Sequence, residues 1–236
     1  MVTLDNLIDS VRQRADLQGS QFITDTEITS YLNSSLAELY GIIIDSFENY
    51  YVTSLQFTLQ AGDDGYTLPA DFFKELRIDR SYSGSPAVQN YDWIRLQRIN
   101  IKDEANYNST PLRSLYYPRI FGYVLYGTKI KIVPRSEIAG TYQLLYYPVY
   151  TDLVNRTDVA TQIGPAGQHW EEYAIIDACI KCLLKEETDI SGFAAQKQLI
   201  IDRIKKEAAN RVAGDAEPPY MSGPRWYDRG WGTWCY

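Results

Sequence analysis

The chain has 236 residues, of which 45% are hydrophobic and 22% charged, and this balance predicts one globular domain or one domain with a large insertion. A formal net charge of −7 and a pI near 4.8 argue against a dedicated nucleic-acid-binding protein, which would carry a basic patch or stripe. No apolar run is long enough to span a bilayer, so we expect no membrane partner.

The first 50 residues read as two helices. Thr3 to Ala15 has an apolar stripe at helical spacing, and Thr3 is placed to cap it. Thr24 to Tyr50 predicts a longer helix, because Thr24 and Glu27 have the spacing of a capping box and apolar residues recur along one side. The start of the chain lacks the basic segment and apolar core of a secretory signal.

Between Thr53 and Tyr150 the apolar residues change from helical spacing to alternation, which is typical of strands. The sequence predicts strands around residues 55–59, 76–79, 121–126, 128–133 and 141–147. Turn residues separate these stretches, so we expect an antiparallel meander or a set of hairpins. Residues 92–106 fit neither period.

Two more helices follow a polar loop. Gln168 to Glu187 is apolar on nearly all sides, apart from a narrow polar stripe at Asp177, Lys181 and Lys185, and this pattern predicts a core helix. Ser191 to Ala213 reads as a second helix with one apolar face.

The element order predicts an α+β fold in which both chain ends build one helical bundle around a central antiparallel β-rich insertion. An extended C-terminal tail completes the chain. We expect the bundle to comprise residues 1–51 and 167–213, the β-rich insertion residues 52–150, a linker loop residues 151–166, and the tail residues 214–236.

Charge is uneven along the chain. From Ala15 to Phe73 there is no Lys or Arg, against nine acidic residues. One interpretation is a solvated acidic helix face, and the other is a surface that repels phosphates or meets a basic partner. Both stay open at this point.

No motif in the sequence predicts a catalytic, cofactor-binding or metal site. His169 is the only histidine and begins the core helix, so we interpret it as a capping or interfacial residue. Phosphate-loop and nucleophile-elbow motifs are absent. Cys179 and Cys182 have redox spacing, but they lie in an apolar helix, and we interpret them as small core residues. We therefore predict no enzyme and no cofactor; a glycosidase-like pair of carboxylates stays open.

Three cysteines cannot form a full disulfide framework, so we expect the chain to fold in a reducing, intracellular environment.

The stretch from Gly214 to Tyr236 is rich in prolines, which rule out a regular helix, and in aromatic residues, which disordered linkers normally lack. It either packs on its own domain or forms an extended arm anchored in a partner. Ordering the whole arm costs more free energy than burial of its aromatic side chains provides. An arm would therefore need backbone hydrogen bonds, partial ordering, or many linked copies acting together.

Several stretches resemble the head-to-tail adaptor, or connector, proteins of tailed bacteriophages. The similarity covers the layout of most of the chain and includes a short first helix followed by a long capped helix. The matching stretches are Tyr66-Thr67-Leu68-Pro69-Ala70-Asp71-Phe72, Tyr146-Tyr147-Pro148, Glu171-Glu172-Tyr173-Ala174 and the basic end of the last helix from Arg203 to Arg211.

The resemblance implies a structural protein of the phage neck, made in the host bacterial cytoplasm and located in the virion at the head–tail junction. Members of the family form rings of twelve subunits around the DNA channel, so a dodecamer is implied, with DNA passing through it without sequence-specific binding. Their C-terminal tails dock on the portal protein, and a tail, nozzle or tail-terminator protein follows downstream.

The resemblance implies that this chain docks on the portal through the aromatic residues and two arginines of its tail. These residues are Tyr220, Arg225, Trp226, Tyr227, Arg229, Trp231, Trp234 and Tyr236. Candidate acids of the ring lumen are Asp45, Glu48, Asp63 and Asp64, because like charge lowers affinity for phosphates. A carbohydrate- or receptor-binding module of a phage tail or baseplate is the alternative function.

Overall fold

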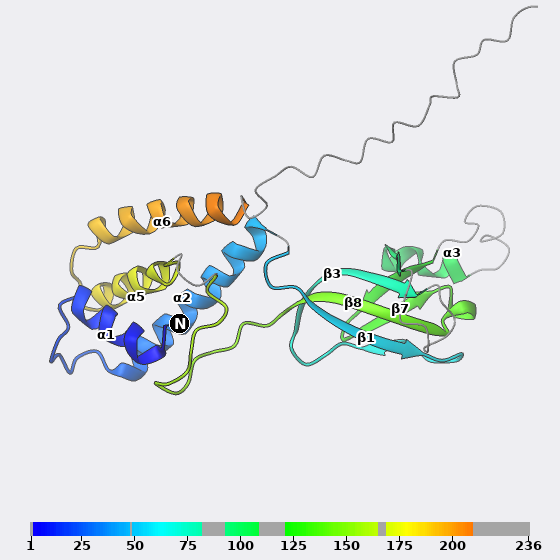
Figure 1. Cartoon of the computed structure of the whole chain (residues 1–236), viewed down its shortest axis with the longest axis horizontal. Coiled ribbons are helices and arrows are strands. Elements are labelled where there is room, and N and C mark those ends of the chain that lie inside the picture. Colours follow the sequence, from blue (N-terminus) through cyan, green and yellow to red (C-terminus); the bar gives the residue numbers. More distant parts are fainter. Residues whose placement is uncertain (1, 48, 82–92, 109–120, 165–168, 210–236) are drawn as a thin grey trace, which may run out of the picture.

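The computed structural model describes residues 2–47, 49–81, 93–108, 121–164 and 169–209, and its fold is α+β. Helices from the two ends of the described chain lie together in one bundle, and the strands from the middle of the sequence form a β-lobe beside it (Figure 1). The predicted fold class is confirmed. The predicted C-terminal tail, residues 214–236, lies outside the described residues.

The first two helices begin where their capping residues predict. Helix α1 (Leu4–Arg14) is capped by Thr3, whose hydroxyl accepts a hydrogen bond from the amide of Asn6. Helix α2 (Asp25–Ser46) begins with the complete capping box of Thr24 and Glu27. These local sequence signals act independently of the rest of the fold, and this is why they could be read correctly.

The predicted end of α2 at Tyr50 is wrong, because the helix ends at Ser46. Phe47 is extended, with φ −151° and ψ 107°. Its ring lies 6.2 Å from that of Tyr50, which in turn lies 5.6 Å from Trp170. The aromatic residues that looked like a continuing helical stripe instead turn the chain across the end of the bundle.

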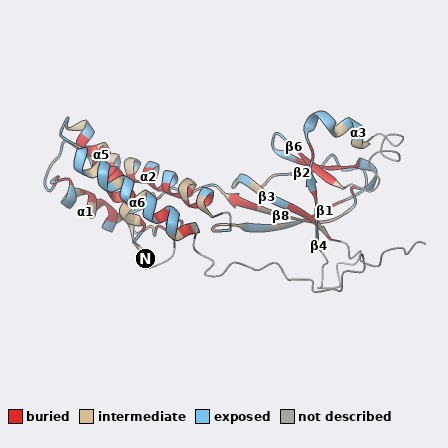
Figure 2. Cartoon of the chain, turned by 90° about the horizontal axis from the view of Figure 1, so that it is seen from above, coloured by how far each residue is buried: buried red, intermediate tan, exposed pale blue. Residues whose placement is uncertain are grey.

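Helices α5 (Glu171–Lys185) and α6 (Ser191–Ala209) complete the bundle and differ in burial. Helix α5 is buried along most of its length, as its sequence predicts, whereas α6 exposes most of its surface (Figure 2). Among the described side chains of α6, the fully buried ones are Ile204 and Ala208. The common core joins α1, α2, α5 and α6 and is centred on residues that include Leu7, Leu32, Leu36, Leu39, Tyr173 and Ala178.

The β-lobe contains two four-stranded sheets. The first has the order β1-β8-β3-β4, formed by β1 (Thr53–Leu59), β8 (Gly140–Pro148), β3 (Phe72–Ser81) and β4 (Trp93–Arg95). The second has the order β2-β7-β6-β5, formed by β2 (Tyr66–Thr67), β7 (Lys129–Val133), β6 (Gly122–Tyr126) and β5 (Gln97–Arg98). Side chains of both sheets, including Phe57, Ile78, Ile130, Ile132, Tyr142 and Leu144, form its core.

The expected meander or set of hairpins is confirmed for β6 and β7 and is wrong for β8. Strands β6 and β7 do form a hairpin, with Gly127 at a φ of 59° in the turn. Strand β8, however, leaves that sheet and inserts between β1 and β3. Strand β5 pairs parallel to β6, so each sheet contains contacts between segments far apart in the sequence.

The stretch at residues 92–106 was ambiguous in sequence because it contains several short elements. In the described part it forms β4, β5, the 3-10 turn η1 (Ile101–Asp103) and the start of α3 (Glu104–Asn108). A second 3-10 turn, η2 (Arg135–Glu137), precedes β8. None of these elements is long enough to produce a readable period.

Tyrosines join the bundle to the β-lobe. The hydroxyl of Tyr40, on α2, donates a hydrogen bond of 2.6 Å to the carbonyl oxygen of Pro148, at the end of β8. The Tyr40 ring also lies 5.1 Å from that of Tyr51 and 6.1 Å from that of Tyr150. The two segments that connect the lobes are thus held on the same helix.

Candidate interaction surfaces

The eight tail residues with a predicted docking role, Tyr220, Arg225, Trp226, Tyr227, Arg229, Trp231, Trp234 and Tyr236, lie outside the described residues. The structure does describe the helix that leads to them. The indole nitrogen of Trp170, a residue only 1% exposed, donates to the carboxylate of Glu207 on α6 at 2.7 Å. Arg203 on α6 donates to the carbonyl oxygen of His169 at 3.4 Å. The last described turns before the tail are therefore held against α5.

A buried carboxylate also ties α6 to the bundle. Asp177, on α5, is 4% exposed, and its oxygens accept hydrogen bonds from Lys197 of α6 at 2.8 Å and from Ser35 of α2 at 2.6 Å. Lys181 forms an ion pair with the same carboxylate at 2.8 Å. Burial alone would raise the pKa of Asp177, but the hydrogen bonds from Lys181, Lys197 and Ser35 outweigh it and hold the pKa below its usual value.

The sequence did not reveal this role of Asp177, which was recognised only as part of the narrow polar stripe of a core helix. The i, i+4 spacing to Lys181 is the same for an exposed pair and for a buried one. The available signal was the placement of one acid within an otherwise apolar helix.

The three candidate lumen acids that the structure describes, Asp45, Asp63 and Asp64, do not form one group. Glu48 lies outside the described residues. Asp45 has a side chain that is 78% exposed and lies 3.7 Å from Lys74. Asp63 accepts a hydrogen bond of 2.7 Å from the amide of Gln60, within a turn. Asp45 is thus at the end of the bundle, whereas Asp63 and Asp64 follow the far end of β1 (Figure 1).

Asp64 is surrounded by cations. Its carboxylate forms ion pairs with Lys129 at 3.7 Å, with Lys131 at 3.8 Å and with Arg135. All three partners come from β7 or from the turn after it. Three positive side chains around one acid make this part of the surface locally basic, whereas the sequence alone suggested an acidic loop.

Cations from distant segments also neutralise much of the acidic stretch between Ala15 and Phe73. Asp25 pairs with Arg156 and with Arg12, whose Nε lies 2.9 Å from it. Glu27 pairs with Lys185 at 2.6 Å, and this contact lowers the pKa of the Glu27 carboxyl. Ion pairs formed in the folded protein therefore balance much of the negative charge that is concentrated in this part of the sequence.

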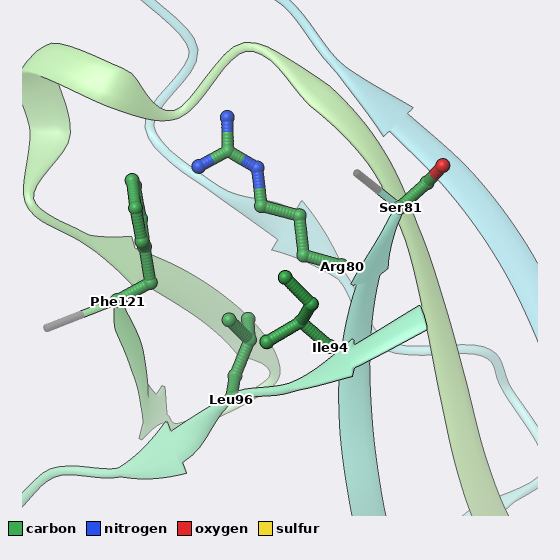
Figure 3. Close-up of a pocket in the computed structure, with 5 residues that line it drawn as sticks. All are labelled: Arg80, Ser81, Ile94, Leu96 and Phe121. Carbon is green, nitrogen blue, oxygen red and sulfur yellow. The ribbon is translucent and has the colours of Figure 1, made fainter. Parts of the chain in front are cut away.

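A cavity of about 270 Å³ opens at one end of the first sheet (Figure 3). Arg80 and Ser81 of β3, Ile94 of β4, Leu96 and Phe121 line it. The guanidinium of Arg80 lies 4.4 Å from the centre of the Phe121 ring and donates to the carbonyl oxygen of Ala139 at 3.0 Å. These lining residues include no acid, histidine or cysteine, so they supply no proton-transfer pair.

The cysteines and the histidine considered as reactive residues lie in the core and on the surface, respectively. Cys179 and Cys182 are both buried, as predicted, and burial raises their thiol pKa values to about 12 and about 11. His169 is exposed at the start of α5, and its ring lies 3.1 Å from Glu171. Within the described ranges, no cluster of His, Cys, Asp and Glu side chains could hold a metal ion. No helix in the same part of the chain has the length and apolar character needed to cross a membrane.

Comparison with known proteins gives one family. A family model described as "SU10 adaptor protein" matches residues 2–222. The match covers the bundle and the β-lobe and continues beyond α6. No curated protein matches the chain.

Proposed function

The chain belongs to the SU10 adaptor protein family, and on this premise we propose that it is a ring-forming adaptor of the phage neck that joins the head to the tail around the DNA channel. As a phage structural adaptor, the protein belongs to the virion. The finer assignment to the head–tail junction rests on the resemblance in layout and on the family match over residues 2–222, which carries the proposal. The ring we propose is a dodecamer, assembled after synthesis in the host bacterial cytoplasm.

Residues 214–236 act in this proposal as the portal-docking tail. Trp226, Trp231 and Trp234 would anchor each arm, since buried Trp and Tyr side chains dominate interface hot spots. The anchoring of α6 through Lys197 and Glu207 supports this role, because it gives the arm a firm base. Each arm alone would bind weakly, and a ring of arms would bind tightly through effective concentration.

The opposite side of the ring would meet a downstream tail, nozzle or tail-terminator protein. DNA would pass through the lumen without sequence-specific contacts. Asp45 faces Lys74, whereas the three cations beside Asp64 weaken the negative potential of the loop that also contains Asp63. Slower genome passage in an Asp45→Lys, Asp63→Lys particle of normal assembly would support the lumen assignment, and unchanged passage would remove it.

Electron microscopy tests the ring directly. Negative-stain images of the purified protein, alone and mixed with portal protein, should contain rings that stack coaxially on the portal. A protein that stays monomeric under both conditions would contradict the proposal. Glycan binding by such a monomer would instead favour the alternative of a carbohydrate- or receptor-binding module.

A further inference from the structure

The first sheet of the β-lobe has one long open edge. Strand β1 is seven residues long and pairs with β8 alone, over its whole length from Thr53 to Leu59. The strands at the other sheet edges, β2, β4 and β5, are only two or three residues long. β1 is therefore the described edge with the most backbone groups to offer to another strand.

The pairing of β8 with β3 and with β1 shows which backbone groups of β1 point away from the sheet. Ile78 of β3 accepts from Leu96 on the β4 side, so its neighbours Arg77 and Asp79 face β8, where they pair with Leu145 and Gln143. Val149 donates to Asp71 on the same side of β8, and this contact gives the same alternation.

The residues of β8 between these positions therefore face β1. Their partners in β1 are Thr53, Leu55, Phe57 and Leu59. The backbone N–H and C=O groups of the intervening residues, Ser54, Gln56 and Thr58, point away from the sheet. The structure gives these six groups no hydrogen-bond partner among the described residues.

This edge also lacks the features that usually prevent strand addition. Natural edge strands are protected by charged residues, prolines, bulges or short length. The stretch from Val52 to Gly62 contains neither a charged residue nor a proline. Its pairing with β8 has no register shift, whereas the pairing of β3 with β8 has two.

The side chains of β1 suit the addition of a strand from another chain along its open edge. Ser54, Gln56 and Thr58 are exposed on the outer face, while Phe57 and Leu59 are buried in the lobe core. The ring of Phe57 stacks on Tyr66 at 4.1 Å. An added strand with alternating polar and apolar residues would extend both faces in the same pattern.

Charge favours contact between copies at the β-lobe. The described residues of the bundle, 2–47, 149–164 and 169–209, carry 17 acidic and 9 basic side chains, so two bundles repel each other. The described residues of the β-lobe, 49–81, 93–108 and 121–148, carry 8 acidic and 9 basic side chains and are nearly neutral. Copies can therefore approach closely at the lobe without this repulsion.

We propose that the open edge of β1 is a subunit interface, at which a second copy of this chain adds an extended segment by hydrogen bonding to Ser54, Gln56 and Thr58. Pairing of β1 with β1 would be a twofold contact that closes a dimer, so a ring requires a segment other than β1. The inference rests on the proposed ring and names the contact that would join its copies.

Hydrogen exchange tests the contact in the full-length protein. The amides of Ser54, Gln56 and Thr58 should exchange quickly in the dissociated subunit and at least tenfold more slowly in the assembled ring. The amides of Leu55 and Phe57 are the internal control, because β8 already binds them in both states. Equal exchange of the three outward amides in subunit and ring would overturn the inference.

A substitution provides a second, independent measurement. Gln56→Pro removes one outward N–H, and proline is tolerated at a strand edge where that group is not bonded within the sheet. We expect this variant to remain folded and to shift the subunit–ring equilibrium at least tenfold toward subunits. The matched control Gln56→Thr keeps the N–H and should assemble normally.

The outcomes separate the contact from the proposed function. If Gln56→Pro assembles as the control does, the β1 contact is wrong and the ring stands. If the unmodified protein forms no ring, with or without portal protein, the proposed function itself fails. Protection of the three amides by portal protein, without assembly of copies, would assign the edge to the portal and overturn the inference. Should Gln56→Pro not fold, the exchange comparison decides.

Discussion

The side-chain amine of Lys197 lies 2.8 Å from the buried carboxylate of Asp177, and this contact ties α6 to the centre of the bundle. Helix α6 has few fully buried apolar side chains among its described residues, so its polar contacts add to the packing of its partly buried apolar side chains on the core. Helix α6 leads into the tail. In the proposed assembly, a force on the docked tail would therefore reach the bundle through this contact.

Replacing Lys197 by Met should reduce the free energy of unfolding by about 1–3 kcal/mol, because it removes a hydrogen bond to a buried charge. The loss stays below that of an isolated buried pair, since Lys181 and Ser35 still contact Asp177. Urea unfolding measures the change. Lys205→Met, at an exposed position of the same helix, is the matched control and should stay within about 0.5 kcal/mol of the unmodified protein. Equal stability of the two variants would remove the proposed role of the pair.

The same carboxylate predicts a dependence of stability on pH. The pKa of Asp177 is lowered in the folded protein, so its ionised form contributes stability above the unfolded pKa of about 3.9. That contribution disappears as the pH falls through the folded pKa. The stability difference between the unmodified protein and Asp177→Asn should therefore be largest near neutral pH and shrink in acid. A difference that is constant from pH 7 to pH 3 would contradict this account.

The β-lobe should be removable from the bundle. Thr53 and Tyr146 are direct partners in β1 and β8, so the chain enters and leaves the lobe at adjacent positions, about 5 Å apart. Joining Val52 to Tyr147 with a short Gly-Ser linker should leave a soluble chain with a helical circular dichroism spectrum and cooperative melting. This outcome would support the proposed division into bundle residues 1–51 and 167–213 and insertion residues 52–150. A chain that loses its helical signal would show that the bundle depends on the lobe.

The buried thiols should be unreactive in the native protein. Burial raises the pKa values of Cys179 and Cys182 to about 12 and about 11, so little thiolate is present at pH 8, and the reagent has no access to either sulfur. Cys235, outside the described residues, is expected to react first. A disulfide-exchange reagent should thus modify one thiol per native chain and three after unfolding. Rapid modification of all three in the native protein would contradict the prediction.

The sequence predicted features that depend on neighbouring residues. The caps at Thr3 and Thr24 and the apolar pattern of α5 identify their elements from a few positions each. The position of β8 between β1 and β3 could not be predicted in this way, because it depends on pairing across more than 60 residues.

The charged groups illustrate the same limit. Asp64 looked acidic in sequence because its three cationic partners lie more than 60 residues away, on and after β7. Likewise, nothing near Asp177 in the sequence indicates Ser35 as a partner. Charge patterns along a chain predict the sign of a surface only where tertiary ion pairs do not rearrange them.

The tail is the most direct test of the central claim. A chain that ends at Val212 should remain folded and form rings, but it should lose attachment to portal-bearing heads when the two are sedimented together. Full-length Trp226→Ala, Trp231→Ala should weaken attachment at least tenfold with little change in melting temperature, because in the proposal these side chains bind the partner and not the protein's own core. Attachment of the truncated chain with unchanged affinity, or its failure to fold, would contradict the account and indicate a tail packed on its own domain.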